Sequence, residues 1–142
     1  MSARWGFDLN AADAADRADA LLAESPADPD RLLLVAAVRS SRGDDRGALQ
    51  AAEGAVAADD GSAPAHTTLA TLLARSGDSE ASRRHAARAA ELDPDDPIAL
   101  FNRGAAAWAG HDHKGARADF QRAADILGVE VSPWWRPWRR AR

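Results

Sequence analysis

The chain has 142 residues and a mass of 15.0 kDa, which suits one domain and is too short for two of ordinary size. It contains no cysteine, so disulfides, zinc–thiolate sites and thiol nucleophiles are excluded. The formal net charge is −4, but residues 1–127 carry −7 and residues 128–142 carry +3, so a basic tail follows an acidic body.

The N-terminal residues 1–10 contain no apolar run of signal-peptide length, and no later segment reaches membrane-spanning length. We therefore expect a cytoplasmic protein. Seventeen of the 18 basic residues are arginine, and a composition rich in Ala, Asp and Arg is typical of a GC-rich bacterial genome.

From residue 11 onward, small and apolar residues recur at helical spacing between breaks made of Gly, Asp and Pro. In one segment, Leu69, Leu72 and Leu73 follow the 3–4 spacing of a helix face, and Gly77 marks its end. The pattern predicts seven helices, which in chain order span residues 11–24, 29–42, 45–58, 63–76, 79–91, 97–110 and 113–127.

The sequence repeats itself with a period of 34 residues. Gly43 and Gly77 are one period apart, and an Asp follows each. Small residues let neighbouring helix axes approach closely, and a helix hairpin that cannot bury both faces alone must stack on another. Rows of mostly small residues keep the same step: Ala14, Ala48, Ser82 and Ala116; Ala18, Ala52, Ala86 and Phe120; Leu21, Ala55, Ala89 and Ala123.

This pattern resembles the tetratricopeptide repeat, most clearly in RGDDRGALQAAEGAV and SGDSEASRRHAARAAELDP. In the last unit, Gly104, Ala116, Phe120 and Ala123 fall where the family has its small and aromatic signature residues. The resemblance implies an all-α fold, an α-α superhelix (solenoid) of stacked antiparallel helix hairpins with about seven helices.

The repeat register also predicts the organisation of the chain. We expect an N-terminal arm (1–10), a repeat domain (11–127) and a Trp/Arg-rich tail (128–142). The repeat domain divides into a half-repeat at 11–28 and repeats at 29–62, 63–96 and 97–127. Arg39, His66 and Arg103 depart from the family pattern, because those positions are usually apolar.

The sequence predicts no catalytic, metal or cofactor site. His111, Asp112 and His113 are the only clustered metal ligands, but a durable site needs a third and fourth ligand that the sequence does not supply. Carboxylates gather at helix starts and turns, where capping explains them. No phosphate-binding loop or nucleophile elbow is present, so we do not expect an enzyme.

The resemblance points instead to a concave groove. In the family, the first helix of each hairpin lines this face, which holds extended peptides or helices. For Phe101 and Trp108, core packing between hairpins is the alternative. The implied groove residues are Leu33, Ala37, Ser40, Thr67, Thr71, Arg75, Ile98, Phe101, Asn102, Ala105 and Trp108.

Some family members clamp the terminal carboxylate of chaperone tails with Lys, Arg and Asn at set groove positions. This chain has Leu33, Ala37, Thr68 and Ile98 there. A chaperone tail is therefore not the expected ligand.

The C-terminal stretch SPWWRPWRRAR holds three Trp and four Arg in residues 132–142. Pro133 and Pro137 oppose a regular helix, so we expect an extended strap. Trp and Arg are favoured at binding hot spots and at lipid interfaces. The candidate interaction residues are Trp134, Trp135, Arg136, Trp138, Arg139 and Arg140.

Three uses of the tail stay open at this point: packing on its own domain, docking on a partner or another copy, and contact with a membrane surface. Nucleic acid is not expected, because four charges on an acidic body give weak attraction. The sequence thus predicts a non-enzymatic scaffold that binds a protein or peptide in its concave groove, with the tail packed on the domain. The alternative is a peripheral module whose tail engages a membrane or a partner in trans.

Overall fold

A computed structural model of the chain describes residues 8–130. The predictions for the first seven residues of the arm therefore lie outside the described residues. So do the six predicted interaction residues of the tail, Trp134, Trp135, Arg136, Trp138, Arg139 and Arg140.

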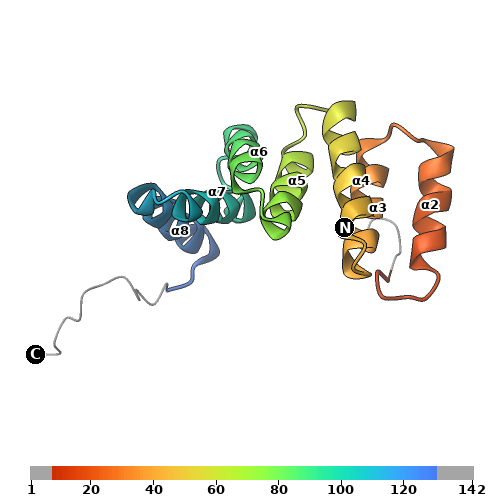
Figure 1. The fold of residues 1–142 in the computed structure, drawn as a ribbon, viewed down its shortest axis with the longest axis horizontal. Coiled ribbons are helices and arrows are strands. Elements are labelled where there is room, and N and C mark those ends of the chain that lie inside the picture. The colour runs from red at the N-terminus through yellow and green to blue at the C-terminus, as the bar shows by residue number, and fades with distance from the viewer. Residues whose placement is uncertain (1–7, 131–142) are drawn as a thin grey trace, which may run out of the picture.

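Seven α-helices make up the described part of the chain, which contains no strand. The prediction of an all-α superhelix is confirmed. The helices follow one another along the molecule, from α2 at one end to α8 at the other (Figure 1). They are α2 (Ala14–Glu24), α3 (Pro29–Ser41), α4 (Asp45–Ala58), α5 (Ala63–Ser76), α6 (Ser79–Leu92), α7 (Pro97–Ala109) and α8 (His113–Leu127).

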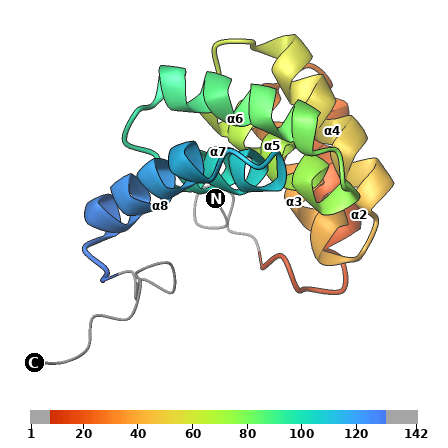
Figure 2. The same cartoon turned by 60° about the vertical axis from the view of Figure 1, so that its left-hand side comes forward.

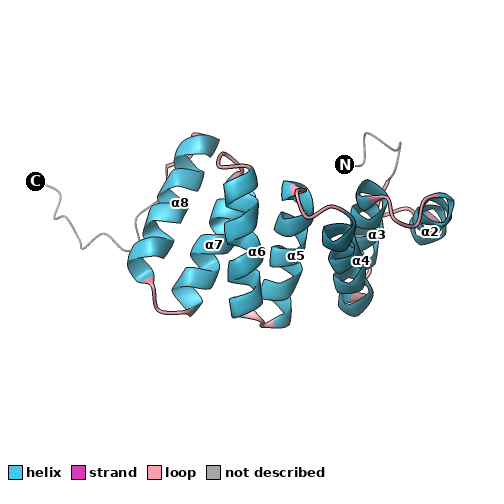
Figure 3. Cartoon of the chain, turned by 90° about the horizontal axis from the view of Figure 1, so that it is seen from above, coloured by secondary structure: helices cyan, strands magenta, loops and turns pink. Residues whose placement is uncertain are grey.

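Each pair of consecutive helices from α3 onward forms an antiparallel hairpin: α3 with α4, α5 with α6, and α7 with α8. Each hairpin packs on the next, and α2 packs on α3 as a half-unit at the start (Figure 3). Successive hairpins are rotated relative to one another, which gives the array its superhelical form (Figure 2). The first helices of the three hairpins begin at Pro29, Ala63 and Pro97, which are 34 residues apart.

Side-chain caps explain where most of the helices begin. At six helix starts an Asp or Ser oxygen accepts a hydrogen bond from a backbone N–H of the first turn, where no helical carbonyl is available. Proline follows within the first two positions of α3, α5 and α7, where its missing N–H costs nothing. The capping residues are Asp28, Asp44, Ser62, Asp78, Asp96 and Asp112.

The first helix was predicted to begin at residue 11, and this boundary is wrong. The Asp8 carboxylate accepts from the Asn10 N–H, and the Asp8 carbonyl accepts from the Ala11 N–H. These bonds form a turn, and α2 begins only at Ala14. The other predicted boundaries agree with the observed ones to within one residue.

The small residues of the repeat rows form much of the core. Ala48, Ser82 and Ala116 are fully buried, as are Ala52 and Ala86 in the next row. The Ser82 hydroxyl donates to the carbonyl of Ala70 at 2.8 Å, so its polar group is satisfied inside the core. Close approach of the helices therefore depends on side chains that are small rather than on side chains that are strongly apolar.

Gly104 shows how close this approach is. A Cβ at this position would lie 2.8 Å from Cε1 of Phe120 and 3.2 Å from the backbone oxygen of Ala116. Both residues belong to α8, so the α7–α8 hairpin requires glycine here. Gly104, Ala116 and Phe120, which fall at signature positions of the family, thus lie against one another.

The turn inside each hairpin carries one residue with positive φ. Gly43 and Gly77 have φ of +80° and +89°, and His111, one period later, has φ of +65°. The third hairpin therefore keeps the left-handed turn although it lacks the glycine that favours it.

All three departures from the family pattern are held by polar partners, which for His66 are His85 and the Asp60 carbonyl. Arg103 in α7 donates to both carboxylate oxygens of Asp119 in α8, at 2.8 and 2.6 Å. This bond to Asp119 is the main reason that the pKa of Arg103 is raised. Arg39 donates to the Gly47 carbonyl and to the Asp19 carboxylate, both at 3.4 Å.

Candidate functional site

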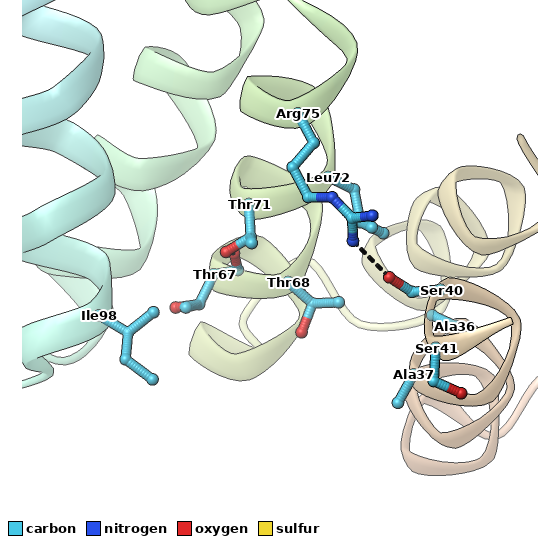
Figure 4. A pocket seen from close by; sticks show the side chains of 10 residues that line it. All are labelled: Ala36, Ala37, Ser40, Ser41, Thr67, Thr68, Thr71, Leu72, Arg75 and Ile98. Carbon is cyan, nitrogen blue, oxygen red and sulfur yellow. Dashed lines mark hydrogen bonds between the residues drawn. The ribbon is translucent and has the colours of Figure 1, made fainter. Parts of the chain in front are cut away.

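A cavity of about 510 Å³ opens between α3 and α5, the first helices of two successive hairpins. Ile98 at the start of α7 closes one side (Figure 4). The lining is made of small and hydroxyl-bearing side chains with few large ones. Its residues are Ala36, Ala37, Ser40, Ser41, Thr67, Thr68, Thr71, Leu72, Arg75 and Ile98.

The cavity exists because α3 and α5 make little direct contact, whereas α5 and α7 are joined more closely. Between α5 and α7, the Asn102 amide donates to the Thr71 hydroxyl at 2.8 Å. In the same junction the Thr67 hydroxyl donates to the carboxylate of Asp96 at 3.0 Å. These bonds hold the second and third hairpins together and leave the first junction as the open one.

Arg75 spans the open junction. Its guanidinium donates to the Ser40 hydroxyl at 2.6 Å (Figure 4). It also donates to the Asp45 carboxylate at 3.0 Å. Its side chain is about half exposed, so its positive charge also faces solvent at the rim. The cation therefore ties the first two hairpins together while marking one end of the cavity.

Ile98 lies on the other side of the cavity from Arg75 (Figure 4). Its side chain is largely exposed, which is unusual for a large aliphatic residue with no functional reason to face water. The site thus has an apolar end and a cationic end, with Ala, Ser and Thr side chains between them.

Six of the eleven predicted groove residues line this cavity. Their position in the cavity does not itself test whether they bind anything. They are Ala37, Ser40, Thr67, Thr71, Arg75 and Ile98.

The other five predicted groove residues lie elsewhere, and two of them are buried in the structure. Leu33 packs with Ala55 and with Ala65 of the next hairpin. Asn102 is buried, with its amide bonded to Thr71. The following hairpin covers Leu33, and the preceding hairpin covers Asn102.

Phe101, Ala105 and Trp108 are not among the residues that line the cavity. The Phe101 ring lies 5.4 Å from the ring of Phe120, and the Trp108 ring lies 4.2 Å from the ring of His113. Both partners belong to α8, so these aromatic residues contact the other helix of their own hairpin, whereas the alternative interpretation was core packing between hairpins.

Sequence reasoning missed four lining residues. Thr68, Thr71, Leu72 and Arg75 follow the i, i+3, i+4, i+7 spacing of one helix stripe, so extending the stripe from Thr71 would have found two of the four. The missed residues are Ala36, Ser41, Thr68 and Leu72.

A second polar cluster lies at the α5–α6 hairpin, away from the residues that line the cavity. Nδ1 of His66 is 3.0 Å from Nδ1 of His85, and the two rings are stacked. Nε2 of His66 lies 2.9 Å from the carbonyl oxygen of Asp60. Burial, followed by the nearby His66, lowers the pKa of His85.

No group of three or more His, Cys, Asp or Glu residues between positions 8 and 130 is arranged to hold a metal ion. His111 and His113 contact each other edge to face, with ring centroids 6.1 Å apart. The Asp112 carboxylate between them caps α8. In the same part of the chain, every helix is too short or too polar to cross a membrane.

Neither a protein-family model nor a curated protein sequence matches the chain. Solved structures do match. The crystal structure of MamA superposes with a TM-score of 0.72 at 15% identity, over 82% of this chain and 68% of MamA. YrrB, described as a tetratricopeptide protein with an unusual peptide-binding site, gives a TM-score of 0.69 at 20% identity, over 80% of this chain and 59% of YrrB.

The first tetratricopeptide domain of Spaghetti (RPAP3), solved with the HSP90 peptide SRMEEVD bound, gives a TM-score of 0.69 at 18% identity. The match covers 72% of this chain and 82% of that one. At these identities the likeness concerns the fold. The chain has the fold of tetratricopeptide-repeat proteins.

Proposed function

We propose that the chain is a non-enzymatic scaffold that binds a protein or peptide segment in the cavity between α3 and α5. The observation that carries this proposal is the cavity itself, which lies between the first helices of two hairpins and is lined by six of the residues that the family resemblance implies. Solved proteins with this fold include one described by its peptide-binding site and one with a peptide bound.

The lining favours a short extended segment over a helix. Ala37 and Thr68 leave a shallow surface on which a backbone can lie close to α3 and α5. An apolar side chain of the ligand would contact Ile98, and a carbonyl or hydroxyl oxygen would accept from Arg75. Such segments gain affinity chiefly through a few anchored side chains.

A strongly acidic peptide is not favoured. Arg75 is the one cation among the lining residues, and it already pairs with the carboxylate of Asp45 at 3.0 Å. A second carboxylate would have to displace Asp45 or share its partner. A neutral segment of small and apolar residues meets no such competition.

We also propose that the chain works in the cytoplasm and that its tail packs on its own domain. The alternative remains a module whose tail engages a membrane surface, another copy or a different protein in trans. No cofactor is part of either proposal.

The groove is tested by selecting linear peptides from a displayed random library on the folded chain. We expect selected peptides to lose binding to the Ala37→Glu variant, because a charged side chain then fills the middle of the cavity. The matched control is Ala57→Glu, at an exposed position of α4 that does not line the cavity.

Circular dichroism establishes that both variants are folded. Peptides that bind the Ala37 variant as tightly as the control would overturn the proposal. So would a library that yields no peptide above background on the unmodified chain.

A further inference from the structure

Three residues at equivalent repeat positions differ sharply in exposure. Leu33, Thr67 and Phe101 are each 34 residues apart. Their exposed fractions are 2%, 8% and 57%, so the first two are buried and the third faces solvent. The third residue is also the largest of the three, which makes its exposure the most costly.

The next hairpin covers this position in the first two repeats. Leu33 of α3 packs with Ala65 of α5, and the Thr67 hydroxyl of α5 donates to Asp96, the cap of α7. Phe101 belongs to the last hairpin of the described chain. Its ring has Phe120 on one side and no hairpin after it.

The last hairpin and the two residues after it carry the other exposed large hydrophobic side chains of residues 8–130. We call the surface at the start of α7 and the end of α8 the terminal face; these two helix ends are neighbours because the hairpin is antiparallel. Concentration of such residues at one end marks a surface that something covers. Ile98 lines the cavity and is not counted, so the residues of the terminal face are Phe101, Ile126, Leu127 and Val129.

Acidic side chains border the terminal face. The turn before α7 carries Asp93 and Asp95, and Arg122 of α8 bonds to Asp95 at 3.3 Å, so this turn lies against the last turns of α8. Asp125 is exposed on α8 itself. In all, residues 8–130 carry 22 acidic and 13 basic side chains, whereas residues 131–142 carry four Arg and no acid.

We propose that the terminal face is the docking site of residues 131–142 of the same chain. Indoles of Trp134, Trp135 and Trp138 cover Phe101 and Leu127, and the arginines face the acidic border. This inference deepens the tail packing proposed above and rests on it, but it is independent of peptide binding in the cavity.

Three observations favour this occupant over a second copy or another protein. The segment begins directly after Glu130, next to Val129 of the terminal face. Twelve residues extend up to ~40 Å, about twice the ~22 Å length of α8, so every part of the face is within reach. An attached segment also has a local concentration in the millimolar range, which a free partner would have to exceed.

The side chains of the tail also suit the chemistry of the terminal face. Each indole buries about 150–250 Å² when fully covered, which suits a flat surface that exposes Phe, Leu, Ile and Val. Pro133 and Pro137 interrupt helical hydrogen bonding, so the segment covers the face as an extended strap rather than as a further hairpin. The positive charges of the strap and the negative charges of the border favour one orientation of the strap on the face.

The test uses the full chain with Trp5→Phe and Trp108→Phe, so that only the tail indoles fluoresce. We expect blue-shifted emission and weak acrylamide quenching, both unchanged by dilution. Phe101→Asp should shift the emission to the red and raise the quenching constant about twofold, since a covered indole then becomes exposed. Ala23→Asp, on an exposed part of α2 at the opposite end, should change neither.

Three outcomes would overturn the proposal. Indoles that are protected only at high protein concentration indicate docking between copies. Indoles that are protected only with phosphatidylserine vesicles indicate a membrane site. Indoles that are equally exposed in the parent and in the Phe101 variant indicate that the tail leaves the face bare.

A second measurement keeps the test valid if the Phe101 variant is poorly folded. In a full chain with Trp134→Ser, Trp135→Ser and Trp138→Ser, Leu127→Ser should lower the urea midpoint less than it does with the Trp residues present. Equal effects in both backgrounds would count against docking. Peptide selection with the Ala37 variant is unaffected by this result, so failure of tail docking and failure of groove binding are distinguishable.

Discussion

His66 and His85 share a single hydrogen bond between their Nδ1 atoms, 3.0 Å apart, across the α5–α6 hairpin. Because Nε2 of His66 faces the Asp60 carbonyl at 2.9 Å, it carries a proton and donates there. In the neutral pair, Nδ1 of His66 then accepts from the Nδ1–H of His85. Two protonated rings would place two N–H groups against each other.

This contact predicts acid sensitivity. The pKa of His85 is lowered by burial, then by His66 and by Arg84, while Asp60 and Glu53 act in the opposite direction. A folded-state pKa below the unfolded value of 6.5 means that unfolded chains bind more protons as the pH falls. The stability from this pair is therefore present above about pH 6.5 and is lost as the pH falls below it.

The measurement is urea unfolding at about pH 7.5 and at about pH 5.5. We expect the free energy of unfolding to fall toward acid in the parent. His85→Gln keeps a donor but cannot titrate, so it should flatten the dependence. A parent and a variant with the same pH profile would contradict the role given to the pair.

The left-handed turn of the third hairpin predicts a stabilising substitution. His111 has φ of +65°, a conformation that costs an L-residue with a side chain roughly 1–2 kcal/mol. His111→Gly should therefore raise the free energy of unfolding by about 1 kcal/mol. The converse change, Gly77→Ala, has open space for its methyl group and should lower it by about the same amount. Thermal unfolding of both variants decides the matter, and a destabilised His111 variant would refute it.

The close approach of α7 and α8 predicts a steric cost. Gly104→Ala would place a methyl group 2.8 Å from the Phe120 ring and 3.2 Å from the Ala116 oxygen. We expect a loss of about 1–3 kcal/mol, typical of overpacking. Adding Phe120→Leu should recover part of this loss, whereas equal effects in the two backgrounds would show that the ring is not the obstacle. Chemical denaturation of the single and double variants provides the comparison.

The bond between Asn102 and Thr71 predicts a coupling across the second junction. Asn102 is buried and donates to the Thr71 hydroxyl at 2.8 Å. Asn102→Ala should cost about 0.5–1.5 kcal/mol, the net value of one hydrogen bond, because the half-buried Thr71 hydroxyl still donates to the Thr67 carbonyl. A double-mutant cycle with Thr71→Val isolates the pair from other effects. Strictly additive losses would mean that the bond contributes nothing to joining the hairpins.

The fold was predictable because it depends on a property that the sequence displays directly. The 34-residue rows name the residues at helix contacts, and Ala48, Ser82 and Ala116 are all buried there. Turn residues and caps recur in the same register, so helix limits followed to within one residue in every helix except the first. Only the start of α2 was predicted wrongly, because a turn at Asp8–Ala11 precedes the helix.

The site was less predictable, because depth depends on neighbours that the register does not specify. Thr67 and Leu33 occupy the same repeat position, yet only Thr67 reaches the cavity. The His66–His85 pair was missed because its two members lie on different helices, 19 positions apart in the sequence. Such contacts require the hairpin geometry as well as the repeat period.

The two junctions of the array differ in a way that bears on its mechanics. Hydrogen bonds of Asn102, Thr71 and Asp96 join α5 to α7, whereas the polar link between α3 and α5 is the long side chain of Arg75, beside apolar packing such as that of Leu33 on Ala65. Elastic opening of the superhelix should therefore be easiest between α3 and α5, which is also where the cavity opens. A segment bound in the cavity would hold α3 and α5 at a fixed separation. Binding would therefore change the curvature of the superhelix, and both ends of the molecule would move.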